Sequence, residues 1–198
     1  MSKKYCEACD RNRDPILAVI RVLFSDCNSV LEIGSGTGQH AVYFAKQMPH
    51  LVWHTSDLPE NLEDIRLWVN DSGLDNLRPP IHLDVTEASW PEIMVDAVFS
   101  ANTTHIMHWP AVAAFIRGTG RILPVDGKFA LYGPFNYHNA YTSQSNADFD
   151  AWLKQRDPDS SIRNFEDLDR LANAAGMRLQ DDVGMPANNR LLCWIKRA

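Results

Sequence analysis

The chain has 198 residues, a length that suits one α/β domain with a substantial core. Its hydrophobic content of 45% is typical of a folded globular protein. The 19 basic and 25 acidic residues give a net charge of −6 without a long block of either sign, which argues against a broad nucleic-acid surface. We therefore expect a small-molecule partner and no nucleic acid, and the oligomeric state stays open.

The sequence shows no clear membrane span and no clear metal or disulfide pattern among its cysteines. No window approaches the roughly 18 apolar residues of a membrane span, so we expect a cytoplasmic protein with no membrane partner. Cys6 and Cys9 form a C-x-x-C, but no second pair follows at the spacing of a metal site, and Cys27 and Cys193 lie far apart. Reduced thiols are therefore expected rather than a zinc site or a disulfide.

A glycine turn after the first expected strand, at residues 30–33, is the strongest local signal. Gly34, Gly36 and Gly38 alternate with small polar residues before a helical pattern begins at Gln39. Such turns use glycine because positive φ and close approach of the backbone to a ligand both exclude a Cβ atom. A turn that serves only strand-to-helix packing would have the same pattern.

The spacing of these glycines separates two classes of nucleotide-type site. In the dinucleotide fingerprint G-x-G-x-x-G, the third glycine falls five residues after the first, where this chain has Gln39. Here the third glycine comes one residue earlier, and Glu32 stands two residues before the turn. A carboxylate there would repel a pyrophosphate and attract an ammonium group. A nicotinamide-dependent oxidoreductase is disfavoured, and no Tyr-x-x-x-Lys is present either.

Helical patterns recur along the chain. The first helix is expected to begin with Asp14 as its N-cap and Pro15 as its first helical residue. The polar segment 1–14 could fold over the mouth of a ligand site or be a solvated leader. The remaining helical patterns cover residues 39–48, 62–73, 110–116, 149–153 and 165–175.

Strands alternate with these helices. They are expected at residues 30–33, 51–55, 81–83, 95–100, 128–132, 177–183 and 191–196. The connection 184–189 is too short for a parallel crossover, so the last two strands should be antiparallel. Asp57 and Asp84 end two of the strands, where open α/β sheets bind ligands, although either acid could instead cap the next turn. The segment 134–146 is long for a plain connection and is a candidate lid.

The stretch Glu32-Ile33-Gly34-Ser35-Gly36-Thr37-Gly38 resembles motif I, E/D-x-G-x-G-x-G, of class I S-adenosylmethionine-dependent methyltransferases. Other stretches resemble a narrower family of small methyltransferase-like proteins of unknown function: residues 11–17, 102–106 with Trp109, 132–135, 149–150, 156–158 and 185–189. The resemblance implies one Rossmann-like domain over residues 1–198. Its sheet would be mostly parallel with a C-terminal antiparallel hairpin, and helices would cover both faces.

The resemblance also implies a cofactor, S-adenosylmethionine. Glu32 would lie near the methionyl amine, Asp57 on the ribose and Asp84 at the adenine. The full set of residues expected to contact the cofactor is Glu32, Gly34, Ser35, Gly36, Gly38, Asp57, Asp84 and Asn102. The expected activity is transfer of the sulfonium methyl to a small nucleophile, which depends mainly on alignment and exclusion of water.

A catalytic base is needed only if the nucleophile arrives protonated. Candidate catalytic residues are His105, Asn102 and Tyr132, with His108 and Tyr137 as further candidates. His105 comes first because histidine titrates near neutral pH. No metal is expected, since no carboxylate completes an obvious ligand set with the two histidines.

Each of these candidates could instead be an ordinary hydrogen-bonding residue. Many amino and amide methyltransferases carry Asn-Pro-Pro-Tyr where this chain has Asn102-Thr103-Thr104-His105, which disfavours transfer to a planar amide or base nitrogen. A non-catalytic S-adenosylmethionine-binding module would keep the acids of the cofactor site and need nothing at Asn102 or His105. The sequence leaves that alternative open.

Overall fold

The computed structural model describes residues 3–198, which form two compact units. The first unit ends at Ser100 and the second begins at Ala101. The main sheet has seven strands, ordered β3-β2-β1-β4 in the first unit and β5-β9-β8 in the second. The prediction of one domain over residues 1–198 stays a prediction.

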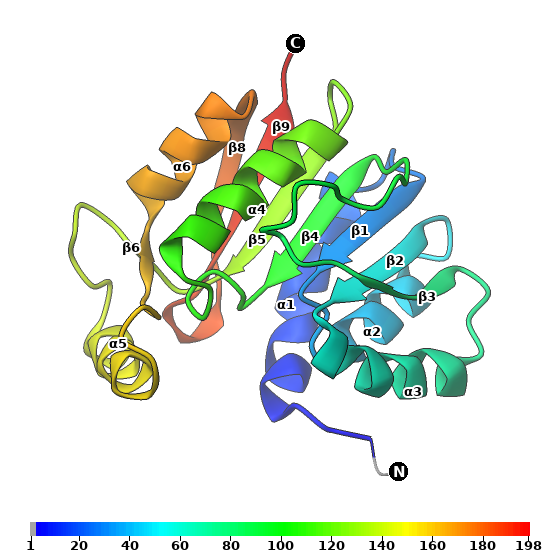
Figure 1. Ribbon diagram of the computed structural model, residues 1–198, viewed down its shortest axis with the longest axis horizontal. Helices are drawn as coiled ribbons and strands as arrows, with labels where there is room; N and C mark the ends of the chain where they lie inside the picture. Colours follow the sequence, from blue (N-terminus) through cyan, green and yellow to red (C-terminus); the bar gives the residue numbers. More distant parts are fainter. Residues whose placement is uncertain (1–2) are drawn as a thin grey trace. The chain divides into compact units, whose positions relative to one another are not determined.

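Parallel strands that alternate with helices build the first unit (Figure 1). Its strands are β1 (Ser29–Ile33), β2 (Val52–Asp57), β3 (Leu77–His82) and β4 (Ala97–Ala101), which ends one residue into the second unit. Its helices are α1 (Glu7–Leu23), α2 (Gln39–Gln47) and α3 (Leu62–Ser72), with the 3-10 turn η1 (Pro59–Asn61) before α3. Because the pairs β1–β2, β1–β4 and β2–β3 are all parallel, their carboxyl ends lie at one edge, where such sheets bind ligands.

An aromatic cluster joins α2 to this part of the sheet. Phe44 on α2 packs against Trp53 on β2 and Phe99 on β4, with ring centroids 5.6 and 5.4 Å away, and all three side chains are fully buried. Burying such rings contributes about 1.5–3 kcal/mol each, together with their edge-on contacts. The cluster fixes where α2 begins, directly after the glycine turn.

Helix α1 begins earlier than the sequence pattern predicts. It starts at Glu7, so Asp14 and Pro15 lie inside the helix rather than at its N-terminus. A proline inside a helix removes one backbone hydrogen bond, and packing against α2 offsets that loss. Asn12 Oδ1 lies 2.7 Å from Nε2 of the buried His40, which holds the first half of α1 in place.

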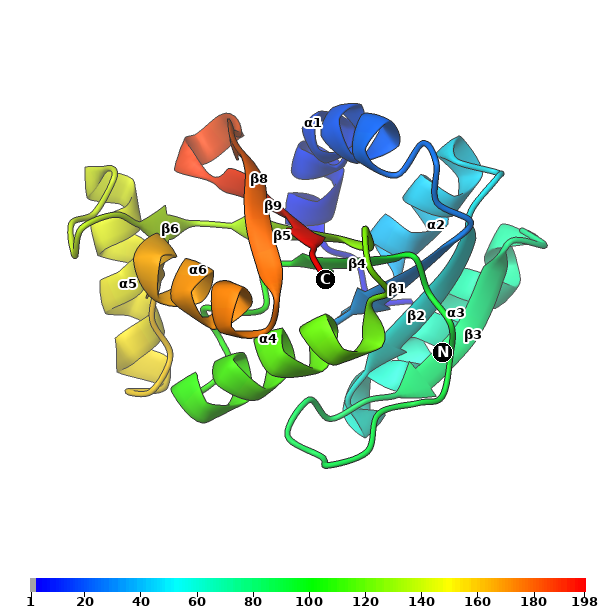
Figure 2. The same ribbon diagram turned by 90° about the horizontal axis from the view of Figure 1, so that it is seen from above.

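Antiparallel strands and three helices build the second unit. The strands of its main sheet are β5 (Lys128–Gly133), β8 (Met177–Gly184) and β9 (Arg190–Lys196), and both the β5–β9 and the β8–β9 pairs are antiparallel. Its helices are α4 (Trp109–Ile122), α5 (Gln144–Arg156) and α6 (Phe165–Ala174), with the 3-10 turn η2 (Pro186–Asn188) between β8 and β9. Figures 1 and 2 show α4 and α6 side by side. The predicted antiparallel hairpin is confirmed.

The candidate lid, residues 134–146, contains structure that its composition does not predict. It includes β6 (Phe135–Asn136), which pairs in parallel with β7 (Arg163–Asn164), and a bridge between Tyr137 and Ala140. Helix α5 then begins at Gln144, with the Ser143 side chain accepting a hydrogen bond from the Asn146 N–H. Whether the segment acts as a lid stays a prediction.

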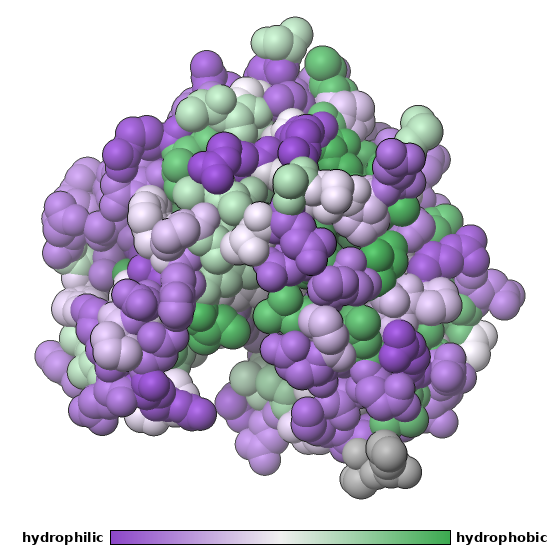
Figure 3. Space-filling model, viewed as in Figure 1, coloured by the Kyte–Doolittle hydropathy of each residue, from purple (hydrophilic) through white to green (hydrophobic). Residues whose placement is uncertain are grey.

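The predicted fold class is confirmed: a mixed α/β chain with a mostly parallel sheet and a C-terminal antiparallel hairpin. On the face shown in Figure 3, hydrophilic residues predominate and apolar residues form small patches. Among residues 3–198, no helix is both long and apolar enough to cross a membrane.

Two glycines of the turn should differ in their effect on stability. A Cβ at Gly38 would lie 3.3 Å from both Ile65 Cα and Trp68 Cβ on α3, whereas a Cβ at Gly36 would meet nothing within 4 Å. Both residues have left-handed φ, which costs an alanine about 1–2 kcal/mol. We expect Gly36→Ala to lower the free energy of unfolding by about 1–2 kcal/mol. Gly38→Ala should lower it by about 1–3 kcal/mol more, because α2 must also move away from α3.

Urea unfolding of the two variants measures this difference. Gly73→Ala is the matched control, because Gly73 also has left-handed φ and open space at its Cβ position but ends α3. It should resemble Gly36→Ala. Equal losses at Gly36 and Gly38 would contradict the packing argument.

Candidate functional site

The glycine turn is pinned to the end of β2. Gly34, Gly36 and Gly38 all have left-handed φ, of 75°, 58° and 89°. The N–H groups of Gly34 and Ser35 both donate to the Ser56 carbonyl, and each N···O distance is 3.0 Å. The turn therefore needs its glycines for backbone conformation, and at Gly36 the missing side chain also leaves open space.

Glu32 lies beneath this turn with its carboxyl group almost fully buried. Its Oε2 accepts hydrogen bonds from Ser35 Oγ at 3.0 Å and from Trp53 Nε1 at 3.1 Å. Burial raises the pKa of Glu32 to about 7, against the opposing effect of these two hydrogen bonds. Oε1 has no hydrogen-bond partner among residues 3–198. The carboxyl group can therefore change its charge near neutral pH, and one oxygen remains for a cationic partner.

Asp57 connects the turn to the next segment. Its Oδ2 accepts from the Gly36 N–H at 2.7 Å, and its Oδ1 accepts from the Leu58 N–H at 2.8 Å and from Asn61 Nδ2 at 2.9 Å. The capping role that the sequence left open is thus present. A carboxylate has about four acceptor positions, so one position on Oδ2 remains for a ligand.

Asp84 follows β3 and caps its own turn. Its Oδ1 accepts hydrogen bonds from the Thr86 N–H at 2.8 Å and from Thr86 Oγ1 at 2.7 Å. These two bonds hold the pKa of Asp84 below its usual value. The adjacent Leu83 N–H donates to the Asp57 carbonyl at 3.0 Å, so the segments of both acids are joined.

The beginning of the described chain lies against the same turn, as one of the two alternatives for the segment 1–14 allows. Gln39 Oε1 accepts from the Cys6 N–H at 2.5 Å and from Thr37 Oγ1 at 3.1 Å. Trp68 Nε1 on α3 donates to the Lys4 carbonyl at 2.9 Å. Whether the segment 1–14 covers the mouth of a ligand site stays a prediction.

In the second unit, Asn102 and His105 meet near the end of β5. Asn102 has left-handed φ of 60°, and its N–H donates to the Tyr132 carbonyl at 2.9 Å. A Cβ on Gly133 would lie 3.9 Å from Asn102 Oδ1 and 4.0 Å from His105 Nδ1. The structure therefore brings together Asn102 and His105, whereas Tyr132 joins them through its backbone carbonyl. Its side chain, next to Gly133 in β5, projects from the opposite face of the sheet.

His105 is the most unusual of the three. Its ring is buried, and Nδ1 has no hydrogen-bond partner within the described part of the chain. Burial, and to a smaller extent the charge of Arg163, lower the pKa of His105 to about 4. The imidazole is therefore neutral at physiological pH. A buried polar atom without a partner is uncommon in proteins and is often found at functional sites.

His108 does not join this group. Its Nε2 lies 2.8 Å from Asp157 and its Nδ1 lies 3.7 Å from Asp159, at the surface. The sequence shows no carboxylate that would complete a ligand set with the two histidines, but these two acids, 49 and 51 positions away, fold back onto His108. The absence of a metal stays a prediction. The three groups could hold a metal ion by distance alone, as exposed acidic groups often could.

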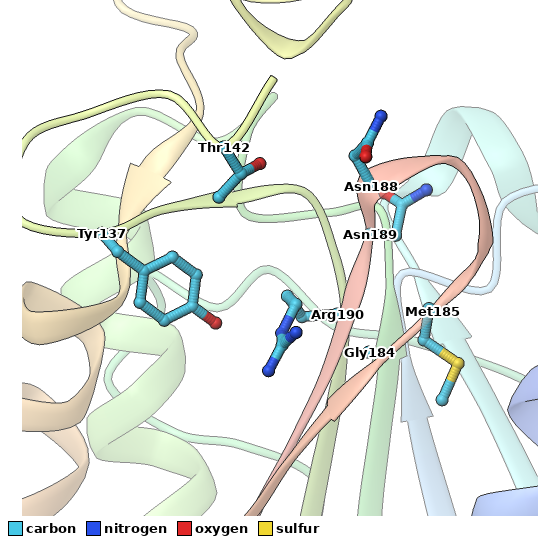
Figure 4. A pocket seen from close by; sticks show the side chains of 7 residues that line it. All are labelled: Tyr137, Thr142, Gly184, Met185, Asn188, Asn189 and Arg190. Carbon is cyan, nitrogen blue, oxygen red and sulfur yellow. The ribbon is translucent and has the colours of Figure 1, made fainter.

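A pocket of about 470 Å³ opens in the second unit (Figure 4). Its lining comes from the candidate lid and the β8–β9 connection: Tyr137, Thr142, Gly184, Met185, Asn188, Asn189 and Arg190. The Tyr137 hydroxyl points toward Arg190 and donates to Asp182 at 2.7 Å. Burial, followed by its hydrogen bond to Asp182, raises the pKa of Tyr137. Tyr137 is therefore a positioned phenol and not a base at neutral pH.

Several solved structures similar to this chain are named as methyltransferases. An O-methyltransferase family protein from Burkholderia thailandensis is 15% identical, with a TM-score of 0.85 over 97% of this chain and 58% of that one. The mitomycin 7-O-methyltransferase MmcR is 17% identical, with a TM-score of 0.83 over 96% of this chain and 54% of that one. Human N-acetylserotonin methyltransferase in complex with SAM is 15% identical, with a TM-score of 0.81 over 97% of this chain and 53% of that one.

This chain thus spans a little more than half the length of each of these proteins. At such low identities the likeness shows the fold, and it confirms the Rossmann-like class I methyltransferase fold that motif I predicts. A model of the family described as "Protein of unknown function (DUF938)" matches residues 3–196. The match extends over nearly the whole chain, and the protein belongs to this family.

Proposed function

We propose that the protein is an S-adenosylmethionine-dependent methyltransferase that acts on a small molecule. The observation that carries the proposal is the buried Glu32 carboxyl beneath a turn of three left-handed glycines, which Asp57 holds from the other side. Such a site suits a ligand with an ammonium group and ribose hydroxyls, and it does not suit a pyrophosphate. The similar human N-acetylserotonin methyltransferase was solved with SAM, which supports the same choice of cofactor.

Three acids and a glycine would hold the cofactor. The remaining oxygen of Glu32 would accept from the amine, and the remaining position on Asp57 Oδ2 would accept from a ribose hydroxyl. Asp84 Oδ2, which has no hydrogen-bond partner in residues 3–198, would accept from the adenine amine. The open space at Gly36 would let the backbone approach the ligand. When bound, the cofactor supplies an electrophilic methyl group.

The second unit would serve the methyl acceptor. The unpartnered Nδ1 of His105 and the Asn102 side chain flank Gly133, whose missing side chain leaves room between them for a small group. Asn102 can both donate to and accept from an acceptor hydroxyl. His105 is neutral at pH 7 and could take up a proton as the nucleophile attacks.

Ligand binding tests the cofactor assignment. Calorimetry should show that wild type binds S-adenosylmethionine and S-adenosylhomocysteine but not NAD. Gly36→Ala should weaken S-adenosylhomocysteine binding by at least tenfold, because its methyl would occupy the open space beside the turn. Gly73→Ala, with the same backbone conformation away from the site, should bind normally. Binding of NAD alone would overturn the proposal.

Binding should also depend on pH through Glu32. Its pKa of about 7 means that the carboxyl group is mostly neutral at pH 5.5 and mostly ionised at pH 8. The amine of S-adenosylhomocysteine stays largely protonated up to about pH 7.5, so its attraction to Glu32 should grow as pH rises. Affinity should increase several-fold from pH 5.5 to 7.5 in wild type and stay flat in Glu32→Gln. Parallel pH profiles would show that Glu32 does not face the amine.

Turnover separates an enzyme from a binding module. An acceptor is first sought by incubating metabolite pools with methyl-labelled S-adenosylmethionine. His105→Ala should then slow methyl transfer by about 10²-fold or more if His105 is a general base, while S-adenosylhomocysteine affinity changes by no more than a few-fold. His50→Ala, an exposed histidine, is the control. Unchanged turnover in both Asn102→Ala and His105→Ala would make this group structural.

A further inference from the structure

Arg190 is held in a fixed orientation at the pocket of the second unit. Its Nε donates to Asp182 Oδ1 at 2.7 Å and its Nη2 donates to the Asp182 carbonyl at 3.0 Å. Asp182 Oδ2 is occupied by the Tyr137 hydroxyl. The guanidinium is therefore held by Asp182 and also interacts with the Tyr137 hydroxyl, while 33% of the Arg190 side chain stays exposed. An oriented guanidinium with an accessible N–H edge is well suited to hold an anion.

Two glycines make room beside this arginine. In the sheet, Arg190 stands directly opposite Gly133 on β5 and Gly184 on β8. A Cβ on Gly184 would come within 3.3 Å of Arg190 Nη1, whereas one on Gly133 would meet only ordinary contacts. Directly opposed residues project from the same face of a sheet, so both missing side chains widen the space on the face where Arg190 lies.

The same register links the pocket to the candidate catalytic residues. The Cβ direction of Gly133 points at Asn102 Oδ1 and His105 Nδ1, both about 4 Å away. Opposed Cβ positions in an antiparallel pair are roughly 4.5–5.5 Å apart. Arg190 therefore leaves the sheet on the face where the Gly133 position borders Asn102 and His105, which lie beside Gly133 and not in the pocket lining itself.

The other lining groups indicate the chemistry of the ligand. Met185 and the ring of Tyr137 are apolar, and Thr142, Asn188 and Asn189 are uncharged. Arg190 is the single cation of the lining, and Asp182 already balances part of its charge. This lining suits one negative charge on an apolar or aromatic body better than a phosphate dianion.

We propose that this pocket binds the methyl acceptor and that the acceptor is a small carboxylic acid, its carboxylate held by the accessible edge of the Arg190 guanidinium. The proposal rests on the proposed function, to which it adds the substrate class. Arg190 acts as a binding residue and takes no part in the transfer of the methyl group.

Binding of two matched probes tests the pocket itself. Benzoate and benzamide have the same shape and differ in charge, and their dissociation constants can be measured by NMR titration of the full chain. Wild type should bind benzoate at least tenfold more tightly than benzamide. Arg190→Gln should reduce this ratio to about threefold or less, and Arg178→Gln, an exposed arginine of β8 outside the pocket, should leave it unchanged.

A second variant guards against misfolding. Arg190→Gln leaves the Asp182 charge without its partner, so Asp182→Asn/Arg190→Gln, which removes both charges, should show the same lost preference in a folded protein. Equal binding of the two probes to wild type, or an unchanged ratio in the double variant, would overturn the proposal. Tighter binding of inorganic phosphate than of benzoate would overturn it as well.

The proposed function can fail separately. S-adenosylhomocysteine should bind Arg190→Gln as it binds wild type, since Arg190 belongs to the pocket of the second unit. If wild type does not bind S-adenosylhomocysteine, the methyltransferase proposal fails whatever the benzoate result. If it does bind, but no carboxylic acid in the labelled-methyl screen is methylated, the substrate class fails while the cofactor assignment stands.

Discussion

The carboxylate of Asp57 organises the candidate cofactor site. One of its oxygens holds the Gly36 N–H and the other holds the segment that leads into α3, so a single side chain fixes both the turn after β1 and the turn after β2. These hydrogen bonds to a charged group contribute about 1.5–3 kcal/mol each. Without them, the left-handed turn would lose its support from β2, and the backbone would no longer present an ordered surface to a ligand.

Glu32 faces the opposite constraint. It is buried where a full charge is unfavourable, and its two hydrogen bonds offset only part of that cost, so its pKa lies near neutrality. A cationic ligand would supply the missing stabilisation. A site of this kind is unfavourable for the folded protein alone and favourable in the complex, which is typical of groups kept for binding rather than for stability.

The second unit also contains both a satisfied charged pair and a buried polar atom without a partner in the described residues. Arg190 and Asp182 satisfy each other and orient Tyr137, whereas His105 Nδ1 is left without a partner in the described chain. Gly133 pairs with Arg190 in the sheet, and its Cβ position borders Asn102 and His105, so a ligand bound as we propose would lie beside this glycine. In the proposed complex, this glycine at the end of β5 would lie between the anion-binding arginine and the candidate catalytic histidine.

Much of this protein could be predicted from its sequence. The glycine spacing with Glu32, the acids at strand ends and the short connection before the last strand depend on local chemistry, and they predicted the fold class and the antiparallel hairpin. The cofactor site that they indicate stays a prediction. The start of α1 was predicted wrongly, and the sequence left open whether the segment 1–14 lies against the turn, where the Cys6–Gln39 contact places Cys6. The acids beside His108 and the pairing of Arg190 with Gly133 and Gly184 were not predicted. These features depend on partners distant in sequence, and only the tertiary structure decides which distant groups meet.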